Sequence, residues 1–140
     1  MIIEEVTDSG AVSFPEILAL MHQLNPKLVV TEEMVRAVVD APVSHLYVMR
    51  DKERIIGTAT LGIYTSPTGR KASVEDVVVL PEYRGRHLGK ELVQHLLDEA
   101  GKHAPIQVHL TSRPSREAAN KLYQSLGFTR KDTNCYILNL

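Results

Sequence analysis

The first residues that could do chemistry are two adjacent carboxylates, Glu75 and Asp76, at the start of an apolar, mostly β-branched run. A carboxylate beside buried apolar residues has a raised pKa, so it could accept a proton from an ammonium group near neutral pH. Adjacent residues on a strand point to opposite faces, so only one of the two should face a substrate unless a bulge intervenes. We favour Glu75 as the base. The alternatives are Asp76 as base or acceptor ligand, or structural roles for both.

The second chemical feature is the basic stretch Arg84–Lys90, which separates the apolar run Val77–Leu80 from the helix-patterned segment Leu88–Ala100. A helix N-terminus offers unpaired backbone N–H groups and a partial positive charge. Glycines let the backbone approach a ligand closely, and Arg84 and Arg86 add fixed charge. This order of strand, basic turn and helix favours binding of a diphosphate. The alternative is an ordinary connection with a solvated basic turn.

Hydrophobic periodicity and capping signals predict the elements that must position these residues. Helices are expected after the caps Ser13 and Thr31, across Leu88–Ala100, and after Ser115; Thr65–Arg70 is expected to be a turn-rich loop. Strands are expected at 2–6, 45–49, 54–64, 74–80, 105–110, 128–130 and 135–138. The resulting order is β-α-α-β-β-β-α-β-α-β-β, which places the chain in the α/β (α+β) class.

Length and composition fit one domain spanning residues 1–140. With 16 basic and 17 acidic residues, the chain shows no general nucleic-acid-binding surface, so an anion site must be local. The first residues lack the pattern of a signal peptide, and no apolar run is long enough to span a bilayer. We therefore expect a cytoplasmic protein.

Two further groups contain residue types that occur in reactive or metal-binding sites. His87, Glu91 and His95 share helical spacing, but no His-Glu-x-x-His motif accompanies them, so we expect no metal site. Cys135 is the single cysteine, which excludes a disulfide framework. It lies in an apolar strand without a basic partner, so we expect a buried, inert thiol.

Two motifs carry a resemblance to a known family. Arg84-Gly85-Arg86-His87-Leu88-Gly89 resembles the Arg/Gln-x-x-Gly-x-Gly/Ala pyrophosphate loop of the GNAT N-acetyltransferases, with His87 where the family usually has its first glycine. Ala119–Phe128 resembles the second family signature, with Asn120, then Leu122-Tyr123, then Gly127-Phe128. The predicted element order also matches. The resemblance therefore covers essentially the whole chain and implies the GNAT fold: a mixed, mostly antiparallel sheet of six to seven strands with four helices.

The resemblance implies that acetyl-CoA is the co-substrate and that no metal takes part. It implies that the apolar strand holds the pantetheine arm through its backbone and that the N–H of Val77 or Val78 stabilises the oxyanion. Tyr123 matches the family tyrosine that gives a proton to the departing thiolate; the alternative is core packing. The implied coenzyme-binding residues are Val77, Val78, Val79, Arg84, Gly85, Arg86, His87, Leu88, Gly89, Lys90, Asn120 and Tyr123.

The sequence specifies the acceptor less closely than it specifies the coenzyme. Glu75–Val79 with Tyr83-Arg84-Gly85 is similar to the glucosamine-6-phosphate N-acetyltransferase branch, which implies a small amine such as an amino sugar phosphate. The alternatives are a protein or peptide acceptor, or a non-catalytic module that binds acyl-CoA. The loop Asn25–Val30 is a candidate acceptor wall, and Arg113 and Arg116 could bind a coenzyme or acceptor phosphate or be merely exposed. The resemblance also allows a homodimer formed through the C-terminal strands.

Overall fold

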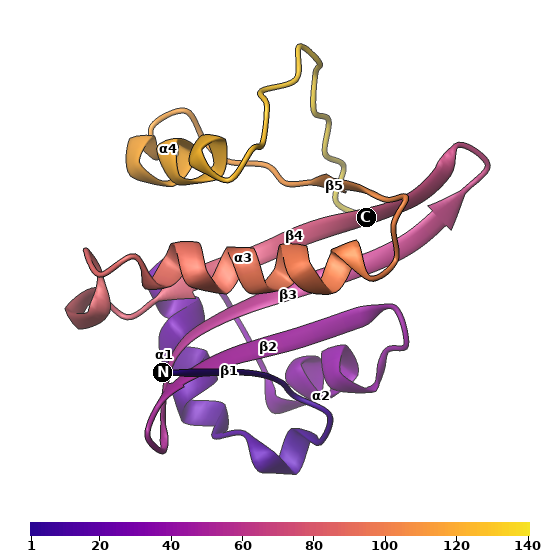
Figure 1. Ribbon diagram of the computed structural model, residues 1–140. Helices are drawn as coiled ribbons and strands as arrows, with labels where there is room; N and C mark the ends of the chain where they lie inside the picture. Colours follow the sequence, from indigo (N-terminus) through magenta and orange to yellow (C-terminus); the bar gives the residue numbers. More distant parts are fainter.

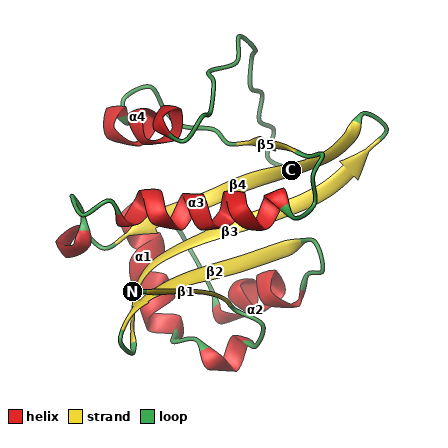
Figure 2. Cartoon of the chain, in the orientation of Figure 1, coloured by secondary structure: helices red, strands yellow, loops and turns green.

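A computed structural model describes all 140 residues of the chain. It confirms the α/β (α+β) class and the predicted order of the four helices (Figures 1 and 2). In chain order the elements are β1 (Ile2–Glu5), η1 (Ser9–Ala11), α1 (Phe14–Leu24), α2 (Glu32–Asp40), β2 (Ser44–Asp51), β3 (Arg54–Ser66), β4 (Gly69–Val79), η2 (Pro81–Tyr83), α3 (Leu88–Gly101), β5 (Gln107–His109) and α4 (Glu117–Ser125).

The sheet has the strand order β1-β2-β3-β4-β5. The first three pairs are antiparallel, and β4 and β5 are parallel because α3 carries the chain back across the sheet. Leu46–Met49 and Ile55–Ala59 are buried without alternation, so both faces of the middle strands are covered. Figure 1 shows α3 lying across β3 and β4 on the viewer's side, with α1 behind them. None of the helices is both long and apolar enough to cross a bilayer.

The caps predicted for the first two helices are confirmed. Ser13 Oγ accepts a hydrogen bond from Glu16 N–H at 3.4 Å, and Thr31 Oγ1 accepts one from Met34 N–H at 3.2 Å. These bonds satisfy donors that a helix start leaves free. The cap predicted at Ser115 is wrong, because α4 begins one residue later and its N-cap, Arg116, makes no side-chain cap.

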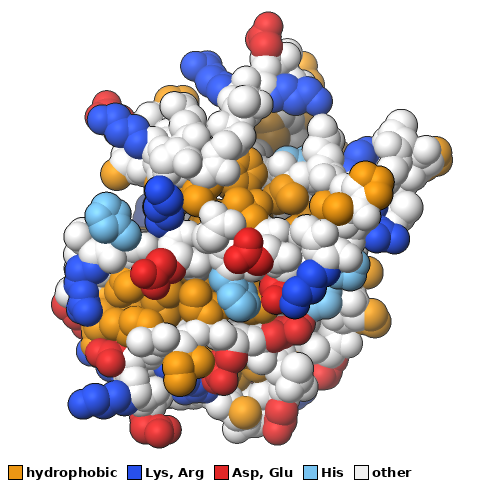
Figure 3. Space-filling view, viewed as in Figure 1, with side chains coloured by type: hydrophobic (Ala, Val, Ile, Leu, Met, Phe, Trp, Pro, Cys, Tyr) orange, Lys and Arg blue, Asp and Glu red, His pale blue; other side chains and the backbone are white.

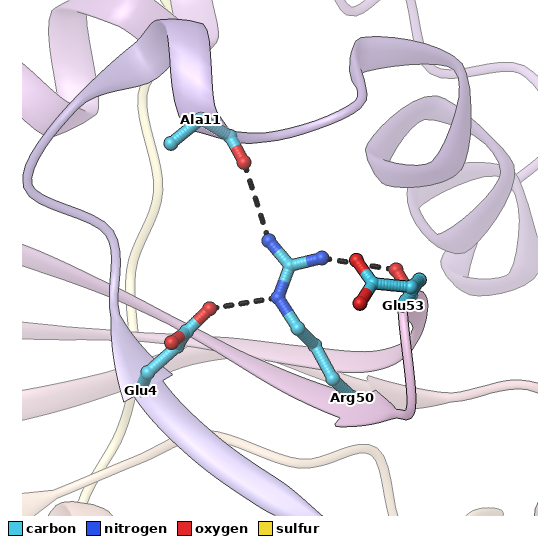
Figure 4. Close-up of polar contacts among 4 residues, drawn as sticks. All are labelled: Glu4, Ala11, Arg50 and Glu53. Atoms are coloured by element: carbon cyan, nitrogen blue, oxygen red, sulfur yellow. Dashed lines mark hydrogen bonds and ion pairs between the residues drawn. The ribbon is translucent and has the colours of Figure 1, made fainter.

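Arg50 of β2 ties three separate segments together (Figure 4). Its Nε donates to Glu4 Oε1 at 2.7 Å, and its terminal nitrogens donate to the carbonyl oxygens of Ala11 and Glu53. The contacts join β1, η1 and the turn between β2 and β3. Because Glu4 is half exposed, the ion pair itself contributes at most about 1 kcal/mol; the network mainly sets where β1 lies.

Two sequence predictions about loops and strands are wrong. The expected loop Thr65–Arg70 is a tight hairpin, because β3 runs to Ser66 and β4 begins at Gly69, whose φ of +124° suits glycine. The expected strands 128–130 and 135–138 do not form, and β5 spans only Gln107–His109, so the sheet has five strands.

The C-terminal segment explains the missing strands. Its apolar residues have strand propensity, but a strand needs a neighbouring backbone to pair with. Tyr136, Ile137 and Leu138 are 87%, 86% and 81% exposed. Figure 1 shows the chain after α4 looping away from the sheet before it returns toward the C-terminus. Local residue preference therefore predicted strands that have no partner within this chain. The expectation that Cys135 is buried is wrong for the same reason, because the thiol lies on this segment and is exposed.

Gly57 on β3 occupies a position with no room for a side chain. A Cβ there would meet Val78 O at 3.3 Å, Val79 Cγ2 at 3.4 Å and Met49 Cβ at 3.5 Å, whereas a Cβ on Gly62 of the same strand would meet nothing within 4 Å. We expect Gly57→Ala to lower the free energy of unfolding by about 1–3 kcal/mol, because neighbouring backbone must shift.

Urea denaturation of the two alanine variants tests this expectation. Gly62→Ala is the matched control and should leave the unfolding midpoint nearly unchanged, since it adds the same methyl group in open space. Equal midpoints for the two variants would contradict the close approach at Gly57.

Candidate active site

A cavity of about 1850 Å³ opens where β4 ends. Its walls come from four segments distant in sequence: the end of β4, the turn into α3, the segment from Thr111 through α4, and the end of α1 with the loop that follows. In Figure 3 the face toward the viewer is hollowed between α3 and α4, with apolar atoms inside the hollow and Lys or Arg side chains beside it.

The cavity exists because β4 and β5 separate. Strand β5 pairs with β4 only over Lys71–Ser73, so Val77–Val79 have β3 on one side and no strand on the other. Backbone N–H and C=O groups on that free edge need partners. One is supplied internally, since Arg84 Nε donates to Val79 O at 3.2 Å. The remaining edge can pair with an extended, amide-containing ligand.

A β-bulge decides which carboxylate reaches the cavity. Thr58 pairs with Val78 and Thr60 with Glu75, so Ala59 stands opposite two residues of β4, Asp76 and Val77. Asp76 has φ of +52°, the left-handed conformation of an extra residue in a bulge. The insertion breaks the strand's alternation at this point.

Asp76 lines the cavity, and Glu75 does not. Glu75 Oε1 accepts a hydrogen bond from Ser73 Oγ at 2.6 Å. Desolvation raises the pKa of Asp76 above its ordinary value, and the nearby Glu75 charge raises it further. The sequence favours Glu75 as the base, whereas this geometry favours Asp76.

The turn Arg84–Lys90 lines the cavity except at one residue. Arg86 is absent from the cavity lining, and its guanidinium lies over the Tyr83 ring, with Cζ 5.3 Å from the ring centroid. Tyr83 is held in turn by a hydrogen bond from its hydroxyl to Asp51 Oδ2 at 2.7 Å. The cation–π contact accounts for the position of Arg86. Arg84 and Lys90 are the lysine and arginine side chains of this turn that line the cavity.

His87, the residue just before α3, has a left-handed backbone conformation. Its φ of +60° is left-handed, which glycine adopts at no cost and other residues at roughly 1–2 kcal/mol. The helix begins at the next residue, Leu88. Gly89 faces α4, where an added Cβ would lie 3.6 Å from Leu122 Cδ1. The first turn of α3 therefore lies close to α4, and its residues Leu88–Lys90 line the cavity.

Tyr123 of α4 lines the cavity opposite this turn. Its ring packs edge-to-face on Phe128, with centroids 6.0 Å apart. Burial raises the pKa of Tyr123 above its ordinary value, against an opposing effect of Arg116. The phenol is thus protonated at neutral pH and able to donate. Asn120 does not line the cavity; its Nδ2 donates to the carbonyl oxygens of Arg113 and Arg116.

The loop after α1 forms the remaining wall. Of the predicted acceptor wall Asn25–Val30, residues Asn25–Leu28 line the cavity, together with Gln23 and Leu24. Asn25 Oδ1 accepts a hydrogen bond from Lys27 N–H at 2.9 Å, which fixes the turn.

No group of three or more His, Cys, Asp or Glu side chains is placed to hold a metal ion.

The family model of the acetyltransferase (GNAT) family matches residues 15–128. The chain belongs to this family. The match spans every element that builds the cavity, from α1 through α4, and GNAT members generally use acetyl-CoA as co-substrate.

Two curated relatives of this GNAT chain align over less than half of its length. A ribosomal protein bS18-alanine N-acetyltransferase of Escherichia coli is 40% identical over 58 residues, which are 41% of this chain and 39% of the relative. A mycothiol acetyltransferase of Tsukamurella paurometabola is 44% identical over 61 residues, 44% of this chain and 20% of that protein. The aligned stretches thus span well under half of the relatives' length.

Solved structures match the whole GNAT fold. A putative acetyltransferase from Agrobacterium tumefaciens has a TM-score of 0.88 at 26% identity, covering 99% of this chain and 100% of that one. Glucosamine-6-phosphate N-acetyltransferase from Arabidopsis thaliana has a TM-score of 0.78 at 21% identity, covering 98% and 97%. The latter likeness shows the fold alone. The family model is what shows the family, and the glucosamine-6-phosphate branch is one structural neighbour among many.

Sequence reasoning did not single out Ser112 and Lys121, which also line the GNAT cavity. A signal for Ser112 was available. It closely follows β5, the parallel neighbour of β4, and residues after the carboxyl ends of adjacent parallel strands meet at one edge of a sheet. Lys121 has no comparable signal, because an exposed lysine on an amphipathic helix is ordinary.

Proposed function

We propose that this chain is an acetyl-CoA-dependent N-acetyltransferase that transfers the acetyl group to a primary amine by direct attack in a ternary complex. The supporting observation is the convergence on one cavity of a free strand edge, a helix N-terminus with basic side chains, a carboxylate and a protonated phenol. Those are the groups that such a reaction needs.

The cavity suits acetyl-CoA as substrate. The N–H groups of the first turn of α3, with Arg84 and Lys90, complement a diphosphate. The free edge at Val77–Val79 complements the amides of a pantetheine arm, which would place the thioester near the bulge. The acceptor then enters beside Asp76, along Asn25–Leu28.

The proposed transfer uses two side chains and one backbone group. Asp76 accepts a proton from the acceptor's ammonium, directly or through water. The free amine attacks the thioester carbonyl, and the N–H of Val77 or Val78 hydrogen-bonds to the oxyanion that forms. The carbon–sulfur bond then breaks, and the thiolate takes a proton from the Tyr123 hydroxyl. The amide nitrogen releases its remaining extra proton to solvent.

The acceptor is proposed as a small amine, and an amino sugar phosphate fits the basic character of the cavity. A protein or peptide N-terminus is the second candidate, supported by the ribosomal-protein-alanine acetyltransferase relative. A non-catalytic acyl-CoA-binding module is disfavoured because Asp76 and Tyr123 both line the cavity. Homodimer formation through the C-terminal segment stays a prediction; the exposed Tyr136, Ile137 and Leu138 support it.

Calorimetric titration with acetyl-CoA tests the coenzyme site. We expect Arg84→Ala with Gly89→Glu to weaken binding at least about 10-fold, because a charged donor is lost and a carboxylate is placed at the diphosphate. The matched control is Arg36→Ala with Gly101→Glu, which makes the same changes at exposed positions outside the cavity. The control should bind like the native chain. A native chain that binds no acetyl-CoA would overturn the proposed function.

A further inference from the structure

The cavity carries more positive charge than a diphosphate requires. Six lysine and arginine side chains line it against two carboxylates, although the whole chain has a net charge of −1. The turn into α3 contributes Arg84 and Lys90, and the loop after α1 contributes Lys27. The other three, Arg113, Arg116 and Lys121, stand together on the α4 side. The structure therefore concentrates cations on a second wall of the cavity, formed by a different segment from the proposed diphosphate site.

The two arginines of this wall are held in place by the backbone. Arg116 N–H donates to Arg113 O at 3.0 Å, which closes a turn before α4. Asn120 Nδ2 then donates to Arg113 O at 2.9 Å and to Arg116 O at 2.8 Å. Asn120 thus acts as a positioning residue, because it holds the turn that carries both arginines, and both line the cavity.

An unpartnered hydroxyl lies beside them. Ser112 Oγ is inaccessible to solvent and has no hydrogen-bond partner within the protein, yet Ser112 lines the cavity. Buried polar groups in folded proteins are almost always hydrogen-bonded. If the Ser112 side chain turns its hydroxyl toward the cavity, an acceptor oxygen of a ligand on this wall completes its bonding. Glu117 is the one carboxylate on the same wall, and it is outnumbered by three cations.

We propose that Ser112, Arg113 and Arg116 form a second anion subsite that binds a phosphate monoester. Guanidinium groups bind phosphate oxygens bidentately, and the serine hydroxyl adds one donor. Two molecules could bring this group: the coenzyme, through its 3′-phosphate, or a phosphorylated acceptor. The inference rests on the proposed function for the identity of the ligands, and the experiment separates the two sources.

Calorimetry with paired ligands tests the subsite. One arm compares coenzyme A with 3′-dephospho-coenzyme A; the other compares glucosamine 6-phosphate with glucosamine in the presence of coenzyme A. We expect the native chain to prefer the phosphorylated member of one pair by about 10- to 100-fold. Arg113→Gln with Arg116→Gln should abolish that preference and leave the affinity for the dephosphorylated member unchanged. Ser112→Ala should reduce the same preference by a smaller factor.

The controls separate the possible failures. Arg36→Gln with Arg130→Gln removes the same charge from exposed arginines outside the cavity and should keep the preference. Melting temperatures identify any variant that fails to fold; Ser112→Ala, which removes one oxygen atom, then carries the test alone. The ligand pair for which the arginine variant loses the preference shows whether the coenzyme or the acceptor brings the phosphate monoester. A preference that survives both substitutions, or a native chain that binds coenzyme A with no preference in either arm, overturns the subsite alone. A native chain that binds no coenzyme A overturns the proposed function as well.

Discussion

Replacing Asp76 with Asn is expected to lower kcat by about 10²- to 10⁴-fold, the range over which a general base contributes. The amide keeps the size of the side chain but cannot take the proton from the acceptor's ammonium. Asp76 lines the cavity at the bulge, whereas Glu75 bonds to Ser73 outside it. Steady-state kinetics with the identified acceptor measure this loss, and calorimetry should show that acetyl-CoA affinity is nearly kept.

Glu75→Gln is the matched control for this prediction, since it neutralises the adjacent carboxylate. It should reduce kcat only modestly, by lowering the pKa of Asp76 toward the ordinary value of 3.8. A larger loss in Glu75→Gln than in Asp76→Asn would reverse the assignment of the base.

The dependence of kcat/KM on pH tests the role of Asp76 independently. Burial and the neighbouring Glu75 raise the pKa of Asp76, so its carboxylate becomes protonated at a higher pH than an ordinary aspartate. Because the base must be deprotonated, kcat/KM should fall as pH decreases through that raised pKa. The Glu75→Gln variant should shift this acid limb to lower pH, and Asp76→Asn should lack it. An acid limb unchanged in Asp76→Asn would assign it to another group.

Replacing Tyr123 with Phe is the second large effect that we expect, a loss of about 10²-fold in kcat. The ring keeps its edge-to-face packing on Phe128, and only the hydroxyl that would protonate the thiolate is removed. Burial raises the pKa of Tyr123 above 10, so the phenol is a competent donor throughout the neutral range. The rate should fall only at pH values above that raised pKa.

The measurement for Tyr123 must separate proton donation from packing. Steady-state kinetics at saturating acetyl-CoA give kcat. Calorimetry gives the coenzyme affinity, and the thermal unfolding temperature reports the packing of the ring. We expect only kcat to change. Tyr136→Phe makes the same substitution at an exposed site outside the cavity lining and should leave kcat unchanged. A Tyr123→Phe variant with native kcat would assign this tyrosine to core packing.

Local signals in the sequence determined the helices and the order of elements up to α4. Ser13 and Thr31 cap α1 and α2 as predicted, because a cap is formed within three residues of chain. The helical pattern Leu88–Ala100 corresponds to α3, since an amphipathic period depends only on neighbouring turns. The sequence also placed the basic turn Arg84–Lys90 between β4 and α3. Such features could be predicted because their interactions lie close together along the chain.

Only the tertiary structure decided which of the candidate residues meet. Strand alternation predicts that Glu75 and Asp76 point apart, but the bulge opposite Ala59 depends on pairing with β3 and selects Asp76. The guanidinium of Arg86 lies over the Tyr83 ring, and Asn120 donates a hydrogen bond to the turn before α4, so neither residue lines the cavity. The predicted strands 128–130 and 135–138 do not form, because no neighbouring strand pairs with them. Strand pairing, side-chain packing and cavity shape all depend on residues distant in sequence, which periodicity and local propensity do not describe.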